Sequence, residues 1–439
     1  MNLDFFKKNI DLVVFFVLLS MGFTLRLLWI LNVPNEPFSD FQTYYEIAIS
    51  IVNGETHSLM GYQGIGYPFI LSVIFSIFNS TDIFIAKFFN VILSTVTLVL
   101  IYLISIKLLK NKWLSLLVLL LVTLLPNYIA YNNIIGTETF FVFLFTLILV
   151  LYLYNFNNKA RLPLLGIIIG FAALTKPQFM IYPILLMIIL FLKNKNLKES
   201  LVFLGVVGIF TAAVISPMAI INYNKFNKFI PISYNGGYVL YINNNDQNNN
   251  GKYMDVNAVT PSEEILVKFA EKNISYGELS AKASDLYKEQ AMDWIKEHPI
   301  TFIKLGLLRI DATFFSGASD IQDWSMSSFN MQLQEKMPWN EYARNIYLFE
   351  FITDTIVYTL SMFGFIFSFL GLYYIIKKFL KMEIPYIISL PSINILFFVL
   401  ICFVFEGQSR YNYPVLFLFI IALVICLDKL LIGYKNMKE

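Results

Sequence analysis

Apolar residues in this 439-residue chain fall into long runs bounded by charged or amide residues. A helix needs about 20 mostly apolar residues to cross a hydrocarbon core of ~30 Å. The pattern therefore predicts an all-α polytopic membrane protein with about ten transmembrane helices. The runs lie at about 11–31, 83–106, 113–131, 138–154, 162–175, 178–192, 200–221, 347–376, 384–405 and 414–433.

Basic residues cluster at alternate ends of these runs, as they do in cytoplasmic loops. By this rule both chain termini are cytoplasmic, and the segments 32–82 and 222–346 lie on the other side. The chain then divides into an N-terminal module of seven spans (1–221), an outer segment (222–346) and a C-terminal module of three spans (347–439). The basic clusters are Lys7 and Lys8; Lys107, Lys110 and Lys112; Lys159 and Arg161; Lys193, Lys195 and Lys198; Lys377, Lys378 and Lys381; and Lys429, Lys435 and Lys438.

Composition narrows the classes of function. The chain is 57% hydrophobic and 14% charged, with a formal net charge of +2, so its charge indicates no nucleic-acid partner. Both cysteines, Cys402 and Cys426, lie in apolar runs, and the two histidines are His57 and His298. A disulfide framework, a zinc site or a histidine-based catalytic centre is therefore not favoured, and no metal-binding residues are predicted.

The first outer loop, 32–82, carries the main candidate for catalysis. Ser39 and Gln42 have the spacing of a capping box, and Gly54 is a typical helix stop, so 40–53 is predicted to be a short helix. Its apolar face suits a helix that lies along the membrane interface. Asp40 then lies in the first turn, where the helix dipole favours the ionised carboxylate that a general base requires. The alternative is that Asp40 is only a helix N-terminal charge.

Two further charged residues lie on the same predicted side. The spans that flank Thr175-Lys176-Pro177-Gln178 use only about 31 residues together, which is too few for two full crossings. Lys176 is therefore predicted to lie below the outer surface, either at a functional anion site or paired with a structural carboxylate. Glu138 begins the fourth span and is interpreted as a second catalytic carboxylate or as a solvated helix cap.

The outer segment is predicted to be mainly helical. The Asn-rich stretch 243–251 is expected to be a flexible loop. Capping patterns at Thr260-Pro261-Ser262-Glu263 and at Ser275 and Glu278 predict helices that run to about 272 and to His298, with Pro299 ending the second. Residues 300–315 are predicted to form an interfacial helix that contains Arg309. Asp320, Asp323 and Trp324 suggest either a sugar contact or a mobile acidic loop.

Several short motifs follow one another in an order that fits this topology. They are Ser39-Asp40 with Tyr44, Ala48 and Gly54; Gly64-Ile65-Gly66-Tyr67-Pro68; Thr137-Glu138; Leu174-Thr175-Lys176-Pro177; Ser216-Pro217; Asn222-Tyr223; Phe229-Ile230-Pro231-Ile232-Ser233 with Gly237; His298-Pro299-Ile300-Thr301-Phe302; and Arg410-Tyr411-Asn412-Tyr413-Pro414. Over most of the chain they resemble the GT-C superfamily of polytopic membrane glycosyltransferases, in particular the branch of protein O-mannosyltransferases and the lipid A aminoarabinose transferase. The chain departs from that pattern at Gln63, Gly64 and Ile221, where family members often carry basic residues.

The resemblance implies a GT-C-like fold and the inverting transfer of a sugar from a polyprenyl-phosphate donor. Asp40 would be the base, Glu138 would position Asp40 or the acceptor, and Lys176, Arg410 and Arg309 would hold the phosphate. Arg26 would pair with an outer carboxylate or be structural. No cofactor is required, and a divalent metal is not indicated, although carboxylates can bind one. Further candidates for the substrate pocket are Tyr44, Gln63, Tyr67, Asn222 and Tyr411.

The expected partners are a lipid-linked sugar donor, membrane lipids and an acceptor that is an envelope glycan, a lipid or a protein. Heavy use of Asn, Lys, Ile, Phe and Tyr suggests a bacterial cytoplasmic membrane, with the active site on the extracytoplasmic face. Two alternatives stay open, namely a transporter or flippase of lipid-linked sugars and a glycan polymerase. The chain has no Trp-Trp-Asp motif, which argues against a relative that uses diphosphate-linked donors.

Overall fold

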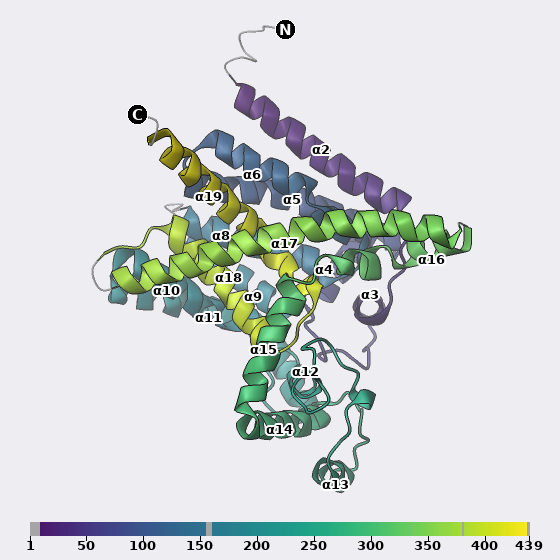
Figure 1. Ribbon diagram of the computed structural model, residues 1–439. Coiled ribbons are helices and arrows are strands. Elements are labelled where there is room, and N and C mark those ends of the chain that lie inside the picture. The colour runs from purple at the N-terminus through teal and green to yellow at the C-terminus, as the bar shows by residue number, and fades with distance from the viewer. Residues whose placement is uncertain (1–8, 155–159, 337, 380–381, 437–439) are drawn as a thin grey trace.

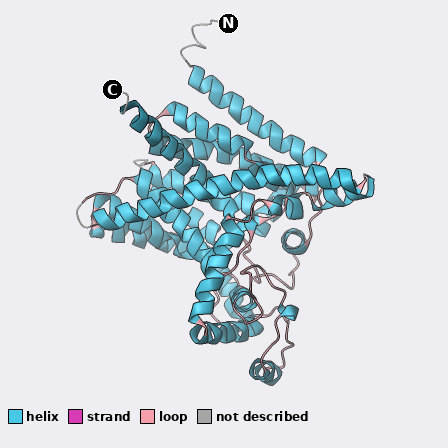
Figure 2. Ribbon diagram, viewed as in Figure 1, coloured by secondary structure: helices cyan, strands magenta, loops and turns pink. Residues whose placement is uncertain are grey.

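A computed structural model describes residues 9–154, 160–336, 338–379 and 382–436. Over these ranges the chain is almost entirely helical and contains no strand (Figures 1 and 2). The basic residues Lys7, Lys8, Lys159, Lys381 and Lys438 lie outside the described ranges. The predicted all-α membrane architecture is confirmed.

Every predicted span lies on helical structure. Among the described residues, seven helices are long and apolar enough to cross a membrane, and α6 with its bent continuation makes an eighth. Two predicted spans, α8 and α9, are shorter apolar helices, so the predicted number of ten is approximate. The N-terminal elements are α2 (Ile10–Asn32), α5 (Ile83–Leu109), α6 (Lys112–Leu124), α7 (Pro126–Ala130), η1 (Tyr131–Asn133), α8 (Thr137–Leu153), α9 (Arg161–Thr175), η2 (Pro177–Ile181), α10 (Tyr182–Asn194) and α11 (Leu197–Phe226). The C-terminal elements are α17 (Trp339–Lys378), α18 (Tyr386–Val404), η5 (Ser409–Val415) and α19 (Leu416–Asn436).

Short turns with local caps join several of these helices. The Asn111 side chain accepts hydrogen bonds from the backbone of Trp113 and Leu114 at the start of α6. Asn196 does the same for Glu199 at the start of α11. Such caps satisfy backbone N–H groups that have no partner inside the helix. The turns can therefore be tight, and the helices they join lie next to one another.

The lysine-rich helix ends gather at one end of the helical body. Lys112 at the start of α6 pairs with Asp11 at the start of α2, with 2.6 Å between Nζ and Oδ2. Lys193 near the end of α10 pairs at 2.8 Å with Glu383, which lies between α17 and α18. The start of α2 and the end of α19 also lie on the same side, at the upper left of Figure 1. This grouping agrees with the predicted topology, but the cytoplasmic location of this end stays a prediction.

Helix α8 occupies the centre of the helical body, and almost all of its side chains are buried. Phe141 and Phe145 pack edge to face on Phe179 from η2, with ring centroids 4.6 and 5.6 Å apart. Phe145 also contacts Phe398 of α18 and Phe417 of α19. Because the two membrane modules enclose α8, its first turn, which carries Glu138, is held firmly in place.

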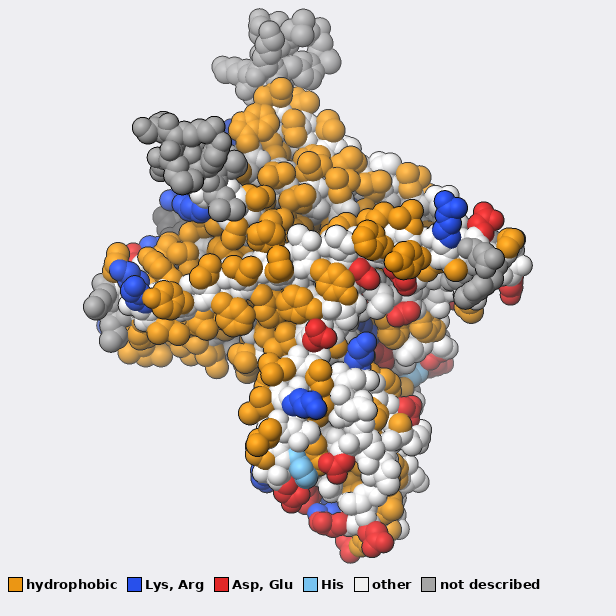
Figure 3. Space-filling view, in the orientation of Figure 1, with side chains coloured by type: hydrophobic (Ala, Val, Ile, Leu, Met, Phe, Trp, Pro, Cys, Tyr) orange, Lys and Arg blue, Asp and Glu red, His pale blue; other side chains and the backbone are white. Residues whose placement is uncertain are grey.

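The part of the outer segment from α12 (Gly236–Asn243) to α15 (Pro299–Phe314) extends from the helical body at the bottom of Figure 1, while α16 (Ser327–Lys336) lies at the right. The apolar side chains of the part from α12 to α15 form a core of their own, which includes Leu240, Tyr241, Phe269, Leu286 and Tyr287. Figure 3 shows many more polar and charged side chains over this part than over the helical body. The elements of the whole outer segment are α12 (Gly236–Asn243), η3 (Val256–Ala258), α13 (Glu263–Glu271), α14 (Ala281–Glu297), α15 (Pro299–Phe314), η4 (Ile321–Ser325) and α16 (Ser327–Lys336).

Two predictions for this segment require correction. The helices begin later than predicted, because Ser262 and Ser280 cap α13 and α14. The Asn-rich stretch is not a loose loop, since Asn243, Asn244, Asn245 and Asn248 are buried. Their side-chain amides donate to nearby backbone carbonyls, which satisfies those carbonyls and folds the stretch against α12. The predicted stop at Pro299 and the helix that follows it are confirmed.

The first outer loop contains α3 (Ser39–Val52) and α4 (Gly66–Phe78). The predicted helix with Asp40 in its first turn is confirmed. The predicted capping box is wrong, because Ser39 has a positive φ of 52° and its side chain makes no cap. Gln42 donates instead to Glu46, one turn farther along α3. Gly54, with φ of 72°, follows the end of α3 as predicted.

Candidate active site

Asp40 lies at a junction of three distant segments. Its Oδ2 is 3.2 Å from Nη2 of Arg410 in η5, and its Oδ1 accepts a 2.8 Å hydrogen bond from Nε2 of Gln63. The Asp40 side chain is 33% exposed and that of Arg410 is 11% exposed. The carboxylate is therefore held by a cation and an amide on the protein side and is still open to a substrate.

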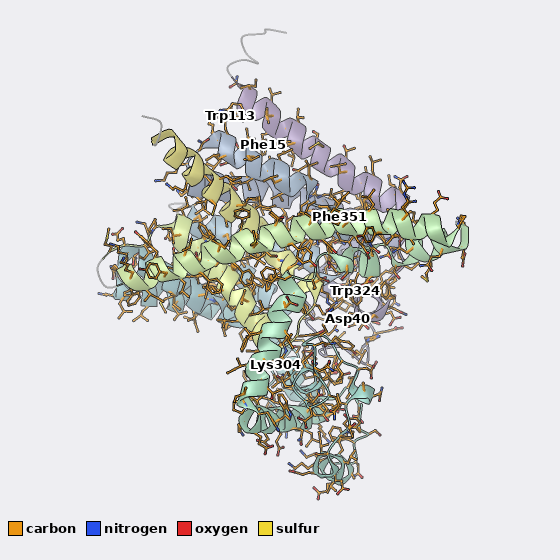
Figure 4. The ribbon with its side chains drawn as sticks, in the orientation of Figure 1. Phe15, Asp40, Trp113, Lys304, Trp324 and Phe351 are labelled. Carbon is orange, nitrogen blue, oxygen red and sulfur yellow. The ribbon has the colours of Figure 1, made fainter. Side chains whose placement is uncertain are left out.

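Trp324 forms one wall of this junction. Arg410 lies over its ring, with 5.1 Å between the guanidinium carbon and the ring centroid. The other contacts of Trp324 are with the first loop, since it stacks on Phe38 at 5.6 Å and meets Phe41 edge to face at 5.3 Å. Figure 4 shows Trp324 and Asp40 close together where the outer segment joins the helical body. The segment of Asp320, Asp323 and Trp324 is therefore packed on the first loop, and its contact with a sugar stays a prediction.

Glu406 is a third carboxylate at this site, and the sequence reasoning did not single it out. Its Oε2 accepts a 3.2 Å hydrogen bond from the hydroxyl of Tyr411, and its Oε1 accepts one from Gln408. Burial raises the pKa of Glu406, while the charge of Arg410 acts in the opposite direction. The signal in the sequence is an acidic residue in the polar turn just before Arg410.

Glu138 and Lys176 form a second ion pair, with 3.1 Å between Oε1 and Nζ. Their side chains are 4% and 19% exposed. Burial, followed by the negative charges of Asp40 and Glu138, raises the pKa of Tyr44, so both carboxylates act on the same buried hydroxyl. Lys176 is thus paired with a buried carboxylate, as one of its two sequence interpretations required, and Glu138 is not a solvated cap.

Several other pocket candidates make structural contacts beneath or beside the site. Tyr44 and Tyr67 are buried, and their ring centroids are 6.5 Å apart in an edge-to-face arrangement. Tyr67 donates to Oδ1 of Asn90 in α5 at 3.4 Å. Asn222 is buried and donates to the carbonyls of Ile230 and Ile232, which shapes the turn after α11. Tyr411, by contrast, lies in the site, where its hydroxyl is 3.3 Å from Nη2 of Arg410.

Arg26 does not pair with a carboxylate among the described residues, so that interpretation is corrected. Its side chain is fully buried inside the helical body. Nε donates to Oγ of Ser94 at 2.7 Å, and Nη1 donates to the carbonyls of Gly22 and Thr123. The guanidinium thus joins α2, α5 and α6, which is the structural interpretation.

Arg309 also differs from its predicted role as a phosphate ligand. The side chain is fully buried, and its Nη atoms donate to the carbonyls of Asn243, Phe403 and Val404 and to Oδ1 of Asn244. Burial lowers the pKa of Arg309 to about 10. The guanidinium therefore fastens the Asn-rich stretch to the end of α18. Both of its Nη groups are used in this way, and only the buried Nε has no partner among the described residues.

No group of three or more His, Cys, Asp or Glu side chains within the described ranges could hold a metal ion. The expectation that no metal or cofactor is required stays a prediction.

Comparisons with known proteins concern part of the sequence and the fold. The sequence profile of the family described as dolichyl-phosphate-mannose-protein mannosyltransferase matches residues 63–221, which include Gln63, Glu138 and Lys176. A search of curated proteins finds no match.

Solved structures of the Archaeoglobus fulgidus oligosaccharyltransferase superimpose on almost the whole chain. The protein AglB in complex with an inhibitory peptide and a dolichol-phosphate has 15% identity and a TM-score of 0.54, over 99% of this chain and 52% of AglB. The apo form has 16% identity and a TM-score of 0.53, over 99% and 52%. The complex with Zn and sulfate has 17% identity and a TM-score of 0.51, over 94% and 49%.

The chain spans about half the length of these solved relatives, and at such identities the likeness concerns the fold. The profile match and the structural match nevertheless agree with each other and with the order of the sequence motifs. The chain is therefore a multi-pass membrane protein with the fold of these oligosaccharyltransferase structures, in agreement with the resemblance of its motifs to GT-C glycosyltransferases.

Proposed function

We propose that the chain is an inverting membrane glycosyltransferase that moves a sugar from a polyprenyl-phosphate donor to an acceptor on the extracytoplasmic face. The observation that carries this proposal is the Asp40 carboxylate. It is partly exposed, is held by Gln63 and Arg410, and lies beside the ring of Trp324. The match of residues 63–221 to a family of lipid-phosphate-dependent mannosyltransferases supports it.

Asp40 is the general base in this proposal. Its Oδ2 or Oδ1 takes the proton of an acceptor hydroxyl while the acceptor oxygen forms a bond to the anomeric carbon. The bond from that carbon to the donor phosphate oxygen breaks, and its electron pair stays on the phosphate. Attack on the face opposite to the leaving phosphate inverts the anomeric configuration. Gln63 orients the carboxylate through its hydrogen bond to Oδ1.

Arg410 stabilises the leaving phosphate. The Nε of Arg410 is buried and has no hydrogen-bond partner among the described residues, so the guanidinium keeps an unused donor beside Asp40. A guanidinium presents several N–H donors in one plane, which suits phosphate oxygens. Lys176 adds positive potential nearby, although Glu138 neutralises much of its charge.

The chemistry of the solved relatives supports the partner classes. One of them was solved with a dolichol-phosphate and an inhibitory peptide, and another carries a tethered acceptor peptide. For this chain we propose a lipid-linked donor and an acceptor that is an envelope glycan, a lipid or a protein.

The position of the polar groups favours a transferase over a transporter. Transporters place substrate-binding groups near the bilayer midplane, often at broken helices. Here Asp40, Glu138 and Lys176 lie at the ends of α3, α8 and α9, at the opposite end of the helical body from the Lys112–Asp11 and Lys193–Glu383 pairs. If those pairs are cytoplasmic, the site opens to the extracytoplasmic face.

The test is transfer by purified protein in nanodiscs with a radiolabelled polyprenyl-phosphate sugar, measured as release of polyprenyl phosphate. Asp40→Asn is expected to lower turnover by roughly 10²-fold or more while donor binding persists. Glu46→Gln removes an exposed carboxylate from the same helix and is the matched control. Wild-type turnover in Asp40→Asn would overturn the assignment of the base. Wild-type protein that moves donor across the bilayer without releasing polyprenyl phosphate would favour the transporter.

A further inference from the structure

Few of the Arg and Lys side chains proposed to bind the donor phosphate are free of protein contacts. Gln63 beside Asp40 is uncharged and donates to the Asp40 carboxylate. Arg309 donates to backbone and amide oxygens, and Lys176 is paired with Glu138. Yet the phosphate needs more positive charge as the reaction proceeds, because a singly charged diester becomes a monoester with a charge of about −2. The structure points to one further cation, Lys252.

Lys252 lies beside the polar turn that leads to Arg410. Residues Gly251 and Lys252 run parallel to Gly407, with a backbone bridge between Lys252 and Gly407. The Gly407 N–H donates to the Gly251 carbonyl at 3.0 Å. Gly407 is three residues before Arg410 and follows Glu406 directly, so the backbone of Lys252 lies at the edge of the site.

The fold holds Lys252 in this place from several directions. The Lys252 carbonyl accepts from Asn248 at 3.0 Å, and its N–H donates to Oδ1 of Asn250 at 2.9 Å. A Cβ on Gly251 would lie 2.8 Å from the backbone nitrogen of Arg309. A Cβ on Gly407 would lie 2.7 Å from the Cα of Arg309. Only glycine allows the two segments, 251–252 and 406–407, to approach the Arg309 backbone so closely. The buried Arg309 therefore holds Lys252 and the turn 406–410 close together.

The charge of Lys252 acts on Asp323, which lies next to Trp324 in the chain. It opposes the rise that burial causes in the pKa of Asp323, the neighbour of Trp324 on which Arg410 lies. The Lys252 side chain is exposed, and its ammonium has no hydrogen bond or ion pair with any described residue. The lysines of the basic helix ends, by contrast, lie at the other end of the helical body.

We propose that Lys252 is a second cation for the donor phosphate, which acts together with Arg410. This inference rests on the proposed function and names a residue that positions and neutralises the leaving group. The ammonium contacts the phosphate oxygens from the outer segment while Arg410 contacts them from η5. Lys252 therefore acts more strongly on the doubly charged leaving phosphate than on the singly charged donor.

The experiment compares Lys252→Gln with Lys272→Gln, which removes an exposed lysine at the end of α13 in the same outer segment. Affinity for polyprenyl phosphate is measured with purified full-length protein in nanodiscs, together with kcat and KM for transfer. Lys252→Gln is expected to weaken binding about tenfold, as befits one charge–charge contact near a protein surface. It should also lower kcat, while Lys252→Arg restores both and Lys272→Gln changes neither.

Two controls test whether Lys252 acts on the phosphate group or on the polyprenyl chain of the lipid. Polyprenol without phosphate should bind the wild type and Lys252→Gln equally, and inorganic phosphate should compete less well with the lipid in the variant. Unchanged affinity and kcat in Lys252→Gln, in a protein whose wild type binds and transfers, would overturn the role of Lys252 and leave the proposed function standing. Wild-type protein that neither binds polyprenyl phosphate nor releases it would overturn the proposed function, and this inference with it.

Discussion

The buried pair of Glu138 and Lys176 allows a quantitative prediction. Replacing Lys176 with Met keeps most of the side-chain volume but removes the cation. Glu138 is only 4% exposed, and its Oε2 already has no hydrogen-bond partner among the described residues. Without Lys176 the carboxylate is left buried with neither its cation nor a hydrogen bond to Oε1.

Breaking a buried ion pair on one side costs about 3–5 kcal/mol. The lower end of that range applies here, because Lys176 is 19% exposed and the charge of Arg410 also favours the ionised Glu138. We therefore expect Lys176→Met to destabilise the protein by about 3 kcal/mol. The control is Lys193→Met, whose ion pair with Glu383 is exposed to solvent and should contribute almost nothing.

The assay is the thermal unfolding temperature of the purified variants in one detergent. Lys176→Met should melt several degrees below Lys193→Met, and the double variant Glu138→Gln with Lys176→Met should recover part of the loss, because no uncompensated charge remains. Equal melting temperatures for the two single variants would refute the reasoning. Donor affinity in the double variant then tests whether Lys176 also binds the donor phosphate. If it does, affinity stays low even though the stability of the fold has been restored.

Two further predictions concern the junction between the modules. Arg309→Lys should destabilise the protein by about 2–4 kcal/mol, because one ammonium cannot satisfy the four acceptors of the guanidinium; thermal unfolding checks this, and a melting temperature equal to that of wild type contradicts it. Burial raises the pKa of Asp320 from 3.8 to about 6. The folded state then holds a proton that the unfolded state has lost between about pH 4 and pH 6, so stability falls by up to ~3 kcal/mol over that window and is constant above it. Asp320→Asn stays neutral and should lose this dependence, and parallel curves of melting temperature against pH in the two proteins would contradict the assignment.

Much of the fold could be predicted from the sequence because apolar runs of sufficient length leave few alternatives in a bilayer. The count of spans is approximate for a local reason. Pro126 begins α7, with one residue between it and the end of α6, and the chain bends by 59° there, so one run contains two helices. Helices α8 and α9 have only 17 and 15 residues, which is short for a full crossing.

The site was harder to predict, because its contacts join distant residues. Asp40 and Arg410 are 370 positions apart, and only the resemblance to a family placed both in one site. Nothing local distinguishes Arg26 or Arg309 from a substrate ligand, since their acceptors are oxygens of other helices and of the Asn-rich stretch. Low complexity suggested a mobile loop at 243–251, but amide side chains can bond to backbone as well as to water. Glu406 was missed because a single acidic residue after an apolar run is common.

The ion pair between Asp40 and Arg410 also bears on how the protein could be divided. Asp40 belongs to the N-terminal module, whereas Arg410 follows α18 in the C-terminal one, and Trp324 beside them comes from the outer segment. A fragment that stops before residue 405 would keep the carboxylate but not the guanidinium. If the two halves were produced as separate polypeptides, recovery of activity would report their correct reassembly, because this pair forms only when both halves meet.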